Sequence, residues 1–226
     1  TVKALKLHGG AEEDALAMPN TEAVSRGFAN LERHAAIVER TKVPFVVAIN
    51  RFHRDTDEEV KAVLELCAAR GWSCATSQVF ARGGDGALDL AKQVIAATEQ
   101  KSDFAPLVDK ELPIKEKLNQ LAERVYGAEL LEYDQEAEKR LKWLNNNGYG
   151  NLPVCVAKTQ YSLSDDPHKL NSPADFKMRV RDFQVSAGAG FVVALMGEIM
   201  TLPGLPKQPA AFNIDVDSDG CITGLT

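Results

Sequence analysis

Two phenylalanines stand just after apolar runs of the kind that form buried strands. Phe52 follows the run FVVAI at residues 45–49, and Phe80 follows WSCAT at residues 72–76. Ligands of open parallel sheets bind at the carboxyl ends of the strands, so two neighbouring strands would turn both rings toward one crevice. Two rings separated by a gap can clamp a flat heteroaromatic ligand, and the Asn50 amide can orient it. The alternative is that both rings fold back onto the core.

A glycine-rich loop follows the second aromatic residue. The sequence RGGDG at residues 82–86 stands directly before an expected helix and could hold an anion at the helix N-terminus. A plain flexible turn explains the same residues equally well. Arg51 and Arg82 border the expected crevice, and their alternative reading is ordinary surface charge.

Two other sequences resemble ion-binding loops only in part. Residues 215–220, DVDSDG, begin like a calcium loop, but the twelfth position is Thr226, where that loop requires a bidentate Glu. Asp219 and Gly220 instead predict a hairpin turn. Lys158 and Thr159 match the end of a phosphate loop, but the glycines that such a loop needs before the lysine are missing.

Histidine and cysteine spacing gives no metal site. His8, in LHGG after an expected strand, is the only one of four histidines kept as a site candidate, and a polar turn residue is the simpler reading. The four cysteines form no CxxC pair, which predicts reduced thiols.

Alternating strands and helices are expected around the two aromatic residues. Asn20 is expected to cap a first helix, Asp55 or Thr56 a second that ends at Gly71, and a third carries Leu88, Ala91, Val94 and Ile95. The alternation predicts right-handed crossovers and a parallel sheet. The opening sequence TVKALKL reads as a strand without an initiator Met, so we expect a fragment that begins inside an element.

The pattern changes near residue 104. Pro113 is expected to open one helix and Asp134 to cap another, and the sequence after Asn151 is largely of the β type. We therefore predict an α/β protein. A parallel-sheet, Rossmann-like domain over residues 1–104 is followed by a smaller α+β domain over residues 105–226.

Composition excludes several classes of protein. The formal charge of −6, with 45% hydrophobic and 26% charged residues, provides no basic stripe for nucleic acid. No apolar run approaches the length of a membrane helix, and no charged-then-apolar leader opens the chain. We expect a soluble, cytoplasmic protein with neither nucleic acid nor membrane among its partners.

Several long motifs resemble one enzyme family over essentially the whole chain. They are VVAINRFHRDTDEEV, LCAARGW, ARGGDGALDLA, YGNLPVCVAKTQYSLSDDP and TLPGLPKQPAAFNIDVDSDGCITGL. Together they resemble formate–tetrahydrofolate ligase. The resemblance implies an ATP-dependent ligase that joins formate to N10 of tetrahydrofolate through formyl phosphate. It further implies Mg2+, a monovalent cation and a homotetramer.

The resemblance also assigns residues. The aromatic pair of the family that sandwiches the folate ring matches Phe52 and Phe80, although the second is commonly Trp. Gly83 and Gly84 would let backbone approach the ligand. The phosphate loop of the family belongs to an upstream half, so this chain alone is expected to be inactive, and its catalytic residues stay unknown. The alternatives are a catalytically silent folate-binding module and an assembly module.

Overall fold

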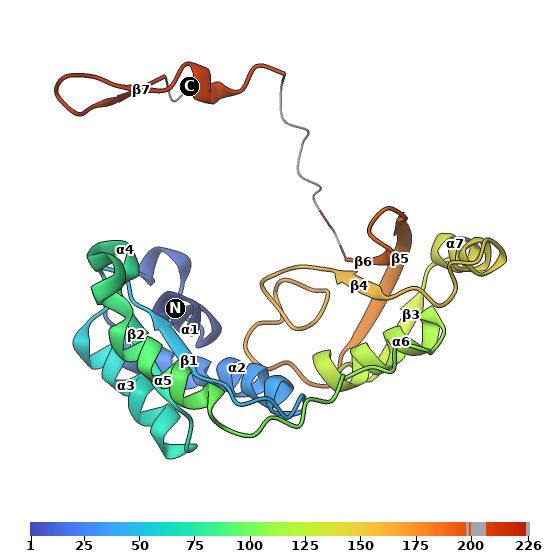
Figure 1. The fold of residues 1–226 in the computed structure, drawn as a ribbon, viewed down its shortest axis with the longest axis horizontal. Coiled ribbons are helices and arrows are strands. Elements are labelled where there is room, and N and C mark those ends of the chain that lie inside the picture. The colour runs from blue at the N-terminus through green and yellow to red at the C-terminus, as the bar shows by residue number, and fades with distance from the viewer. Residues whose placement is uncertain (198, 200–206, 225–226) are drawn as a thin grey trace.

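The computed structural model describes residues 1–197, 199 and 207–224 (Figure 1). The TLPGLP part of the last family-like motif, residues 201–206, lies outside these described residues. The first half of the chain and the second half form separate groups of helices and strands, joined by an extended segment between residues 99 and 113 (Figure 1). None of the described helices is both long enough and apolar enough to span a membrane.

The first element is a helix, so the strand expected at residues 1–7 is wrong. Helix α1 spans Val2–His8, and the Thr1 hydroxyl caps it by accepting a hydrogen bond from Ala4 N at 3.1 Å. Val2 and Leu5 are buried on one face, three positions apart. The lysines between the apolar residues gave the sequence a strand-like alternation that the cap and this buried face override.

Helix α1 packs unusually closely against α2, which spans Thr21–Glu39 and begins at the expected cap, Asn20. A Cβ atom at Gly9 would lie 1.8 Å from Ala23 O, and one at Gly27 would lie 1.9 Å from Leu5 O. These two positions therefore require glycine, because any side chain would separate the two helices.

A parallel strand pair and its crossover helix follow. Strand β1 spans Val47–Asn50, α3 spans Asp57–Ala69 and β2 spans Cys74–Ser77. Thr56 is the cap of α3, and its hydroxyl and the Glu59 carboxylate form a reciprocal capping box. The parallel pairing of β1 with β2 confirms that the two strands are neighbours.

The loop after β2 is more helical than the sequence predicted. A single turn, α4 (Val79–Arg82), leads into a 3-10 helix at Gly83–Ala87 and then into α5 (Leu88–Thr98). The third predicted helix is confirmed as α5. Its apolar residues Leu88, Val94 and Ile95 are nevertheless exposed within the part of the chain that the structure describes.

The second half contains a mixed four-stranded sheet with helices against it. Helix α6 spans Ile114–Leu121, a π-helical turn Ala122–Tyr126 follows, and α7 spans Gln135–Asn146. The sheet order is β3-β5-β6-β4, formed by Leu130–Tyr133, Lys177–Ser186, Phe191–Met196 and Val154–Ala157. The sequence reading missed strand β3. Asp134 stands at the start of α7 as predicted, but its carboxylate pairs with Arg179 rather than capping the helix.

Short elements complete the chain. A 3-10 helix spans Glu13–Ala15 and another spans Ala210–Phe212. The predicted closing hairpin is confirmed: β7 (Asp215–Val216) pairs antiparallel with β8 (Ile222–Thr223), and Gly220 in the turn has a φ of 79°. The backbone there is a turn, as the Asp-Gly sequence predicted.

Two hydrophobic clusters lie on either side of residue 104. One joins α1, α2, β1 and α3 around Phe28 and Val63, and the other joins the four-stranded sheet to α6 and α7 around Phe183 and Leu118. The mixed α/β class with parallel strand pairs is therefore confirmed. The domain boundary stays a prediction.

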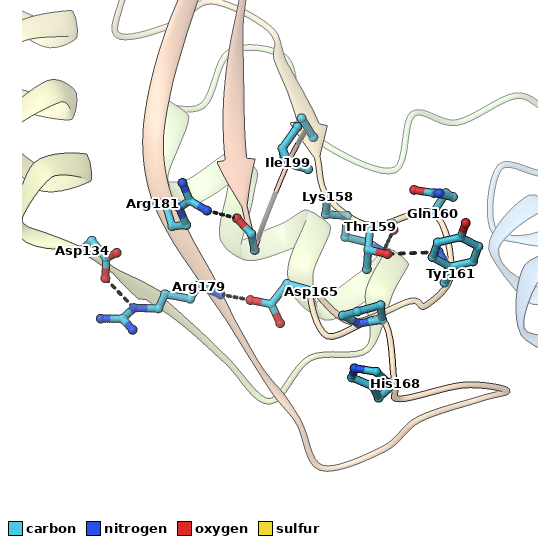
Figure 2. A pocket seen from close by; sticks show the side chains of 13 residues that line it. Asp134, Lys158, Thr159, Gln160, Tyr161, Asp165, His168, Arg179, Arg181 and Ile199 are labelled. Atoms are coloured by element: carbon cyan, nitrogen blue, oxygen red, sulfur yellow. Dashed lines mark hydrogen bonds and ion pairs between the residues drawn. The ribbon is translucent and has the colours of Figure 1, made fainter. Parts of the chain in front are cut away.

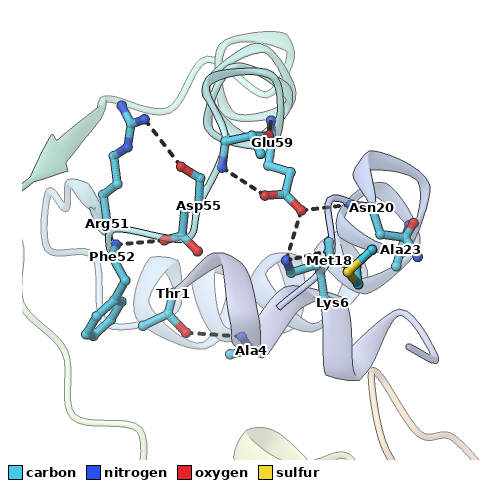
Figure 3. A network of polar contacts seen from close by, with 11 residues as sticks. Thr1, Ala4, Lys6, Met18, Asn20, Ala23, Arg51, Phe52, Asp55 and Glu59 are labelled. Carbon is cyan, nitrogen blue, oxygen red and sulfur yellow. Dashed lines mark hydrogen bonds and ion pairs between the residues drawn. The ribbon is translucent and has the colours of Figure 1, made fainter. Parts of the chain in front are cut away.

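A buried ion pair connects the elements of the first half (Figure 3). Lys6 Nζ lies 2.9 Å from Glu59 Oε1, and both side chains are almost completely buried. The Glu59 carboxylate also accepts hydrogen bonds from Asn20 N at 2.8 Å and Thr56 N at 3.0 Å, and Lys6 donates to Met18 O at 3.1 Å. Burial by itself raises the pKa of Glu59, but these amides and the Lys6 ammonium outweigh it, so the pKa is lowered overall.

We predict that Glu59→Gln destabilises the chain by about 3 to 5 kcal/mol, because it leaves the Lys6 ammonium buried without its partner. Urea unfolding measures the loss. The stability that the wild-type carboxylate contributes is present above the ordinary Glu pKa of 4.5 and is lost as pH falls through the lower folded-state value, and the variant lacks this pH dependence.

Glu65→Gln is the matched control, since Glu65 pairs with Lys61 on the exposed face of the same helix. It should change stability by less than about 1 kcal/mol. Equal losses in the two variants would contradict a special role for the buried pair.

Candidate functional site

The predicted binding residues lie at one edge of the β1–β2 pair. Asn50 is opposite Ser77 in the register, and Arg51 N donates to Ser77 O at 3.0 Å. The Phe52 loop and the Phe80 turn therefore leave the same carboxyl edge of two adjacent strands. This is the arrangement that the strand and helix alternation predicted.

Side chains of the following residues fix the backbone of the Phe52 loop. Phe52 N donates to Asp55 Oδ2 at 2.8 Å, and Asp55 is buried. Arg51 binds Asp57 Oδ1 at 2.6 Å and Asp55 O at 3.3 Å. The Phe52 ring remains 48% exposed and points away from the Asp55 carboxylate (Figure 3). The sequence reading missed Asp55 as a loop-organising residue, although its place beside the helix cap was noted.

Phe80 lies on α4 and is 97% exposed. The alternative in which this ring folds back on the core is therefore wrong for Phe80. Trp72 shows the contrast: its ring packs on Phe28 and Phe45, and its Nε1 donates to Glu39 at 3.0 Å. Trp72 is thus a packing residue.

Three glycines shape the turn after Phe80. Gly83 has a φ of 58°, and a Cβ atom on Gly83 or Gly84 would meet open space. Gly86 is the constrained position, because a Cβ there would lie 2.5 Å from Gln78 O. Gln78 N donates to Gly86 O at 2.9 Å, which closes the loop on itself. The roles predicted for Asn50, Phe52, Phe80, Gly83 and Gly84 in ligand binding stay predictions.

A second candidate site is a cavity of 940 Å³ in the second half of the chain (Figure 2). Lys158, Thr159 and Tyr161 lie on one side of it, and Arg179 and Arg181 lie on the other (Figure 2). Arg179 pairs with Asp134. The register of β5 with β6 shifts between Val180 and Asp182, which places Arg181 at a β-bulge.

Lys158 organises its own loop rather than forming a phosphate loop. Its ammonium donates to Thr159 O at 3.1 Å, to Ser164 O at 2.9 Å and to Ser162 O, and it lies 5.1 Å from the centre of the Tyr126 ring. Burial lowers the Lys158 pKa to about 8, partly opposed by Asp165. The rejection of a Walker motif from the missing glycines agrees with this geometry.

His8 ends a helix instead of following a strand. Its Nδ1 accepts a hydrogen bond from Asn171 N at 2.8 Å, across 163 positions of sequence. Over residues 1–197, 199 and 207–224, no group of three or more His, Cys, Asp or Glu side chains could hold a metal ion. His8 therefore serves first to join the two halves.

We predict that Phe80→Ala changes the free energy of unfolding by no more than about 0.5 kcal/mol, because its ring is almost fully exposed. Phe28→Ala, at a ring that is 1% exposed, should cost about 3 to 5 kcal/mol. Thermal and urea unfolding of both variants check the expectation. A large loss in Phe80→Ala would mean that this ring is a core residue in solution.

The comparison with known families agrees with the sequence resemblance. The model of the formate–tetrahydrofolate ligase family matches residues 1–226, the whole of the chain. The matched range includes the aromatic loops at the β1–β2 edge as well as the Lys158 loop and the four-stranded sheet. The chain belongs to the formate–tetrahydrofolate ligase family.

Proposed function

We propose that this chain supplies the tetrahydrofolate-binding region of an ATP-dependent ligase that joins formate to N10 of tetrahydrofolate. One observation carries the proposal: Phe52 and Phe80 leave the same edge of two paired strands and are both exposed. Contiguous exposed apolar patches mark interaction sites, and Val79 beside Phe80 in the sequence is exposed as well. Membership of the family supplies the ligand that such a pair would take.

A flat pteridine ring between two phenyl rings would remove apolar surface from water on both of its faces. Each aromatic contact contributes about 0.5 to 1.5 kcal/mol beyond the area buried. The bond between Phe52 N and Asp55 reduces the entropy lost on binding, because the first ring already stands on a fixed backbone. Asn50 would orient the ligand through its amide.

The proposed reaction solves a leaving-group problem. Formate cannot expel oxide, so a formate oxygen first attacks the terminal phosphorus of ATP and gives formyl phosphate and ADP. The N10 amine then attacks the formyl carbon, phosphate leaves and N10 loses its proton. The 226 residues contain no Gly-x-x-x-x-Gly-Lys-[Ser/Thr] sequence, so we assign them the folate and not the phosphoryl part of this reaction.

The remaining expectations follow from the family. We propose ATP, Mg2+ and a monovalent cation for the complete enzyme, a homotetramer and a cytoplasmic location. The described residues offer no metal cluster, so no step is assigned to a metal held by this chain. We also propose that the two hydrophobic clusters correspond to a Rossmann-like domain over residues 1–104 and an α+β domain over residues 105–226.

The glutamate tail of folate would then meet basic residues beside the rings. Arg51 is engaged with Asp57, at 2.6 Å, which makes it the poorer of the two candidate partners. Arg82 is exposed at the end of α4. We therefore favour Arg82 for the tail, and equal affinity of the wild-type chain for folate and for a tailless pterin would count against it.

We predict that Phe52→Ala and Phe80→Ala each weaken tetrahydrofolate binding by at least roughly 2- to 12-fold, the equivalent of one lost aromatic contact. Phe80→Trp should strengthen it, because the indole offers a larger stacking surface. Fluorescence quenching or calorimetry with tetrahydrofolate measures all three. Phe104→Ala is the matched control, since Phe104 is also exposed and lies in the extended segment between the two halves.

The same series separates the alternative functions. An assembly module predicts that Phe52→Ala leaves tetrahydrofolate affinity unchanged. A silent folate-binding module predicts normal binding by this chain but no 10-formyltetrahydrofolate when the chain is expressed with its upstream coding region and given formate and ATP. Product formed by that longer protein, and reduced at low tetrahydrofolate by Phe52→Ala, is the result that the ligase proposal expects.

A further inference from the structure

A cavity of 260 Å³ lies where the two halves of the chain meet. Helices α1 and α2 contribute His8, Asn30 and His34 from the first half, and the π-helical turn after α6 contributes Tyr126. The loop after β4 supplies the rest, namely Lys158, Thr159, Gln160, Tyr161, Ser162 and Leu163. In Figure 1 the segment after β4 reaches back toward α2.

The described lining of this cavity carries basic side chains and no carboxylate. Two histidines and one lysine line it, and none of its described lining residues is Asp or Glu. The 940 Å³ cavity, by contrast, is lined by Asp134 and Asp165 as well as by basic residues. A carboxylate-free hollow lined by a lysine and two histidines favours an anion over a cation.

His8 is held in one orientation. Because its Nδ1 accepts from Asn171 N, the neutral ring carries its proton on Nε2, which makes that nitrogen a donor. Asn171 also accepts from Asn30 Nδ2 at 2.7 Å and donates through its side chain to Arg26 O at 3.1 Å. These hydrogen bonds fix the orientation of the His8 imidazole before any ligand binds.

Lys158 provides a positive charge that no carboxylate neutralises at short range. Its hydrogen bonds go to three backbone carbonyls, and among the described residues no Asp or Glu oxygen lies within ion-pair distance of Nζ. Partial burial lowers the pKa of His34, and the Lys158 charge lowers it further. Partial burial also lowers the pKa of His8, with His34 as the second cause.

We propose that this junction cavity binds a small oxyanion, a phosphate or a carboxylate group, between His8, His34 and the field of Lys158. The Tyr126 hydroxyl and the Asn30 side chain complete its polar lining. The site is separate from the aromatic pair at the β1–β2 edge and does not depend on the proposed folate function. The ligand is defined by its negative charge and by the size of a phosphate or carboxylate group.

Binding would be coupled to proton uptake. An anion favours the charged form of His34 and so reverses the effect of burial there. His8 stays neutral and donates through Nε2, because a proton on Nδ1 would break the hydrogen bond from Asn171 N. Affinity should therefore rise as pH falls toward 6. Without the anion, the unfolded chain binds protons more readily than the folded chain, so stability is complete above the ordinary His pKa of 6.5 and falls as pH drops through the lower folded-state values.

Nuclear magnetic resonance of the four histidine rings in the full chain tests the proposal. Inorganic phosphate and acetate are titrated separately, with sodium chloride at matched ionic strength as the reference. We expect the midpoint of His34 to rise by about half a pH unit or more with at least one of the two probes, and the Nε2 resonance of His8 to move as it donates to the anion. His53, on the exposed loop after β1, is the internal control and should not move.

The probes also distinguish the source of the oxyanion. A shift with phosphate alone assigns a phosphoryl group, and a shift with acetate assigns a carboxylate. Equal shifts in sodium chloride, or equal movement of His53, would mean ionic screening and would overturn the proposal. The absence of any shift with either probe would overturn it as well.

Two variants separate binding from folding. His34→Ala should weaken the successful probe about tenfold, because one of two ligand-facing imidazoles is lost, and His53→Ala should leave its affinity unchanged. Urea unfolding confirms that both variants are folded. Tetrahydrofolate binding of His34→Ala should equal that of the wild type, so failure of the oxyanion site and failure of the folate site give different results.

Discussion

The buried pair of Lys6 and Glu59 holds helices α1, α2 and α3 of the first half together. Lys6 belongs to α1. Glu59 accepts hydrogen bonds from Asn20 N at the start of α2 and from Thr56 N at the start of α3. The glycine contacts between α1 and α2 set how closely the pair can approach. Removing two charges from water is costly, so the pair specifies this arrangement more than it stabilises it.

The aromatic edge depends on that arrangement. Helix α3 begins five residues after Phe52, and its cap residue, Thr56, donates to the Glu59 carboxylate. The loop that carries Phe52 therefore has both ends fixed, one in β1 and one at the pair. Phe80 stands on a single helical turn that the bond from Gln78 N to Gly86 O joins to the glycine loop. Its ring is more exposed than that of Phe52, so the two proposed ligand contacts differ in how firmly the chain supports them.

Local signals explain what the sequence could predict. A few neighbouring residues encode each of these signals: the caps at Asn20 and Thr56, the apolar runs of β1 and β2, and the Asp-Gly turn near Gly220. The alternation of these elements then predicted the parallel pairing. Strand β3 was missed because Leu130 to Tyr133 is defined only by its pairing with β5, more than forty residues later. Helix α1 was mistaken for a strand because its apolar face is buried by packing against α2, which the local sequence does not reveal. The Lys158 loop and the His8–Asn171 bond could not be predicted from the sequence, because the tertiary fold determines their partners.

Lys6, which is buried, and Lys158, which is half-buried, have their charges accommodated in different ways. Lys6 meets a carboxylate, so its charge is compensated locally and has little effect beyond the pair. Lys158 meets three carbonyl dipoles, which satisfy its hydrogen bonds but leave its net charge in place. That charge acts on His34, across the junction between the halves. Lys6 therefore stabilises the arrangement of the helices, whereas Lys158 leaves a positive potential at the junction cavity, where residues of both halves would meet the proposed anion.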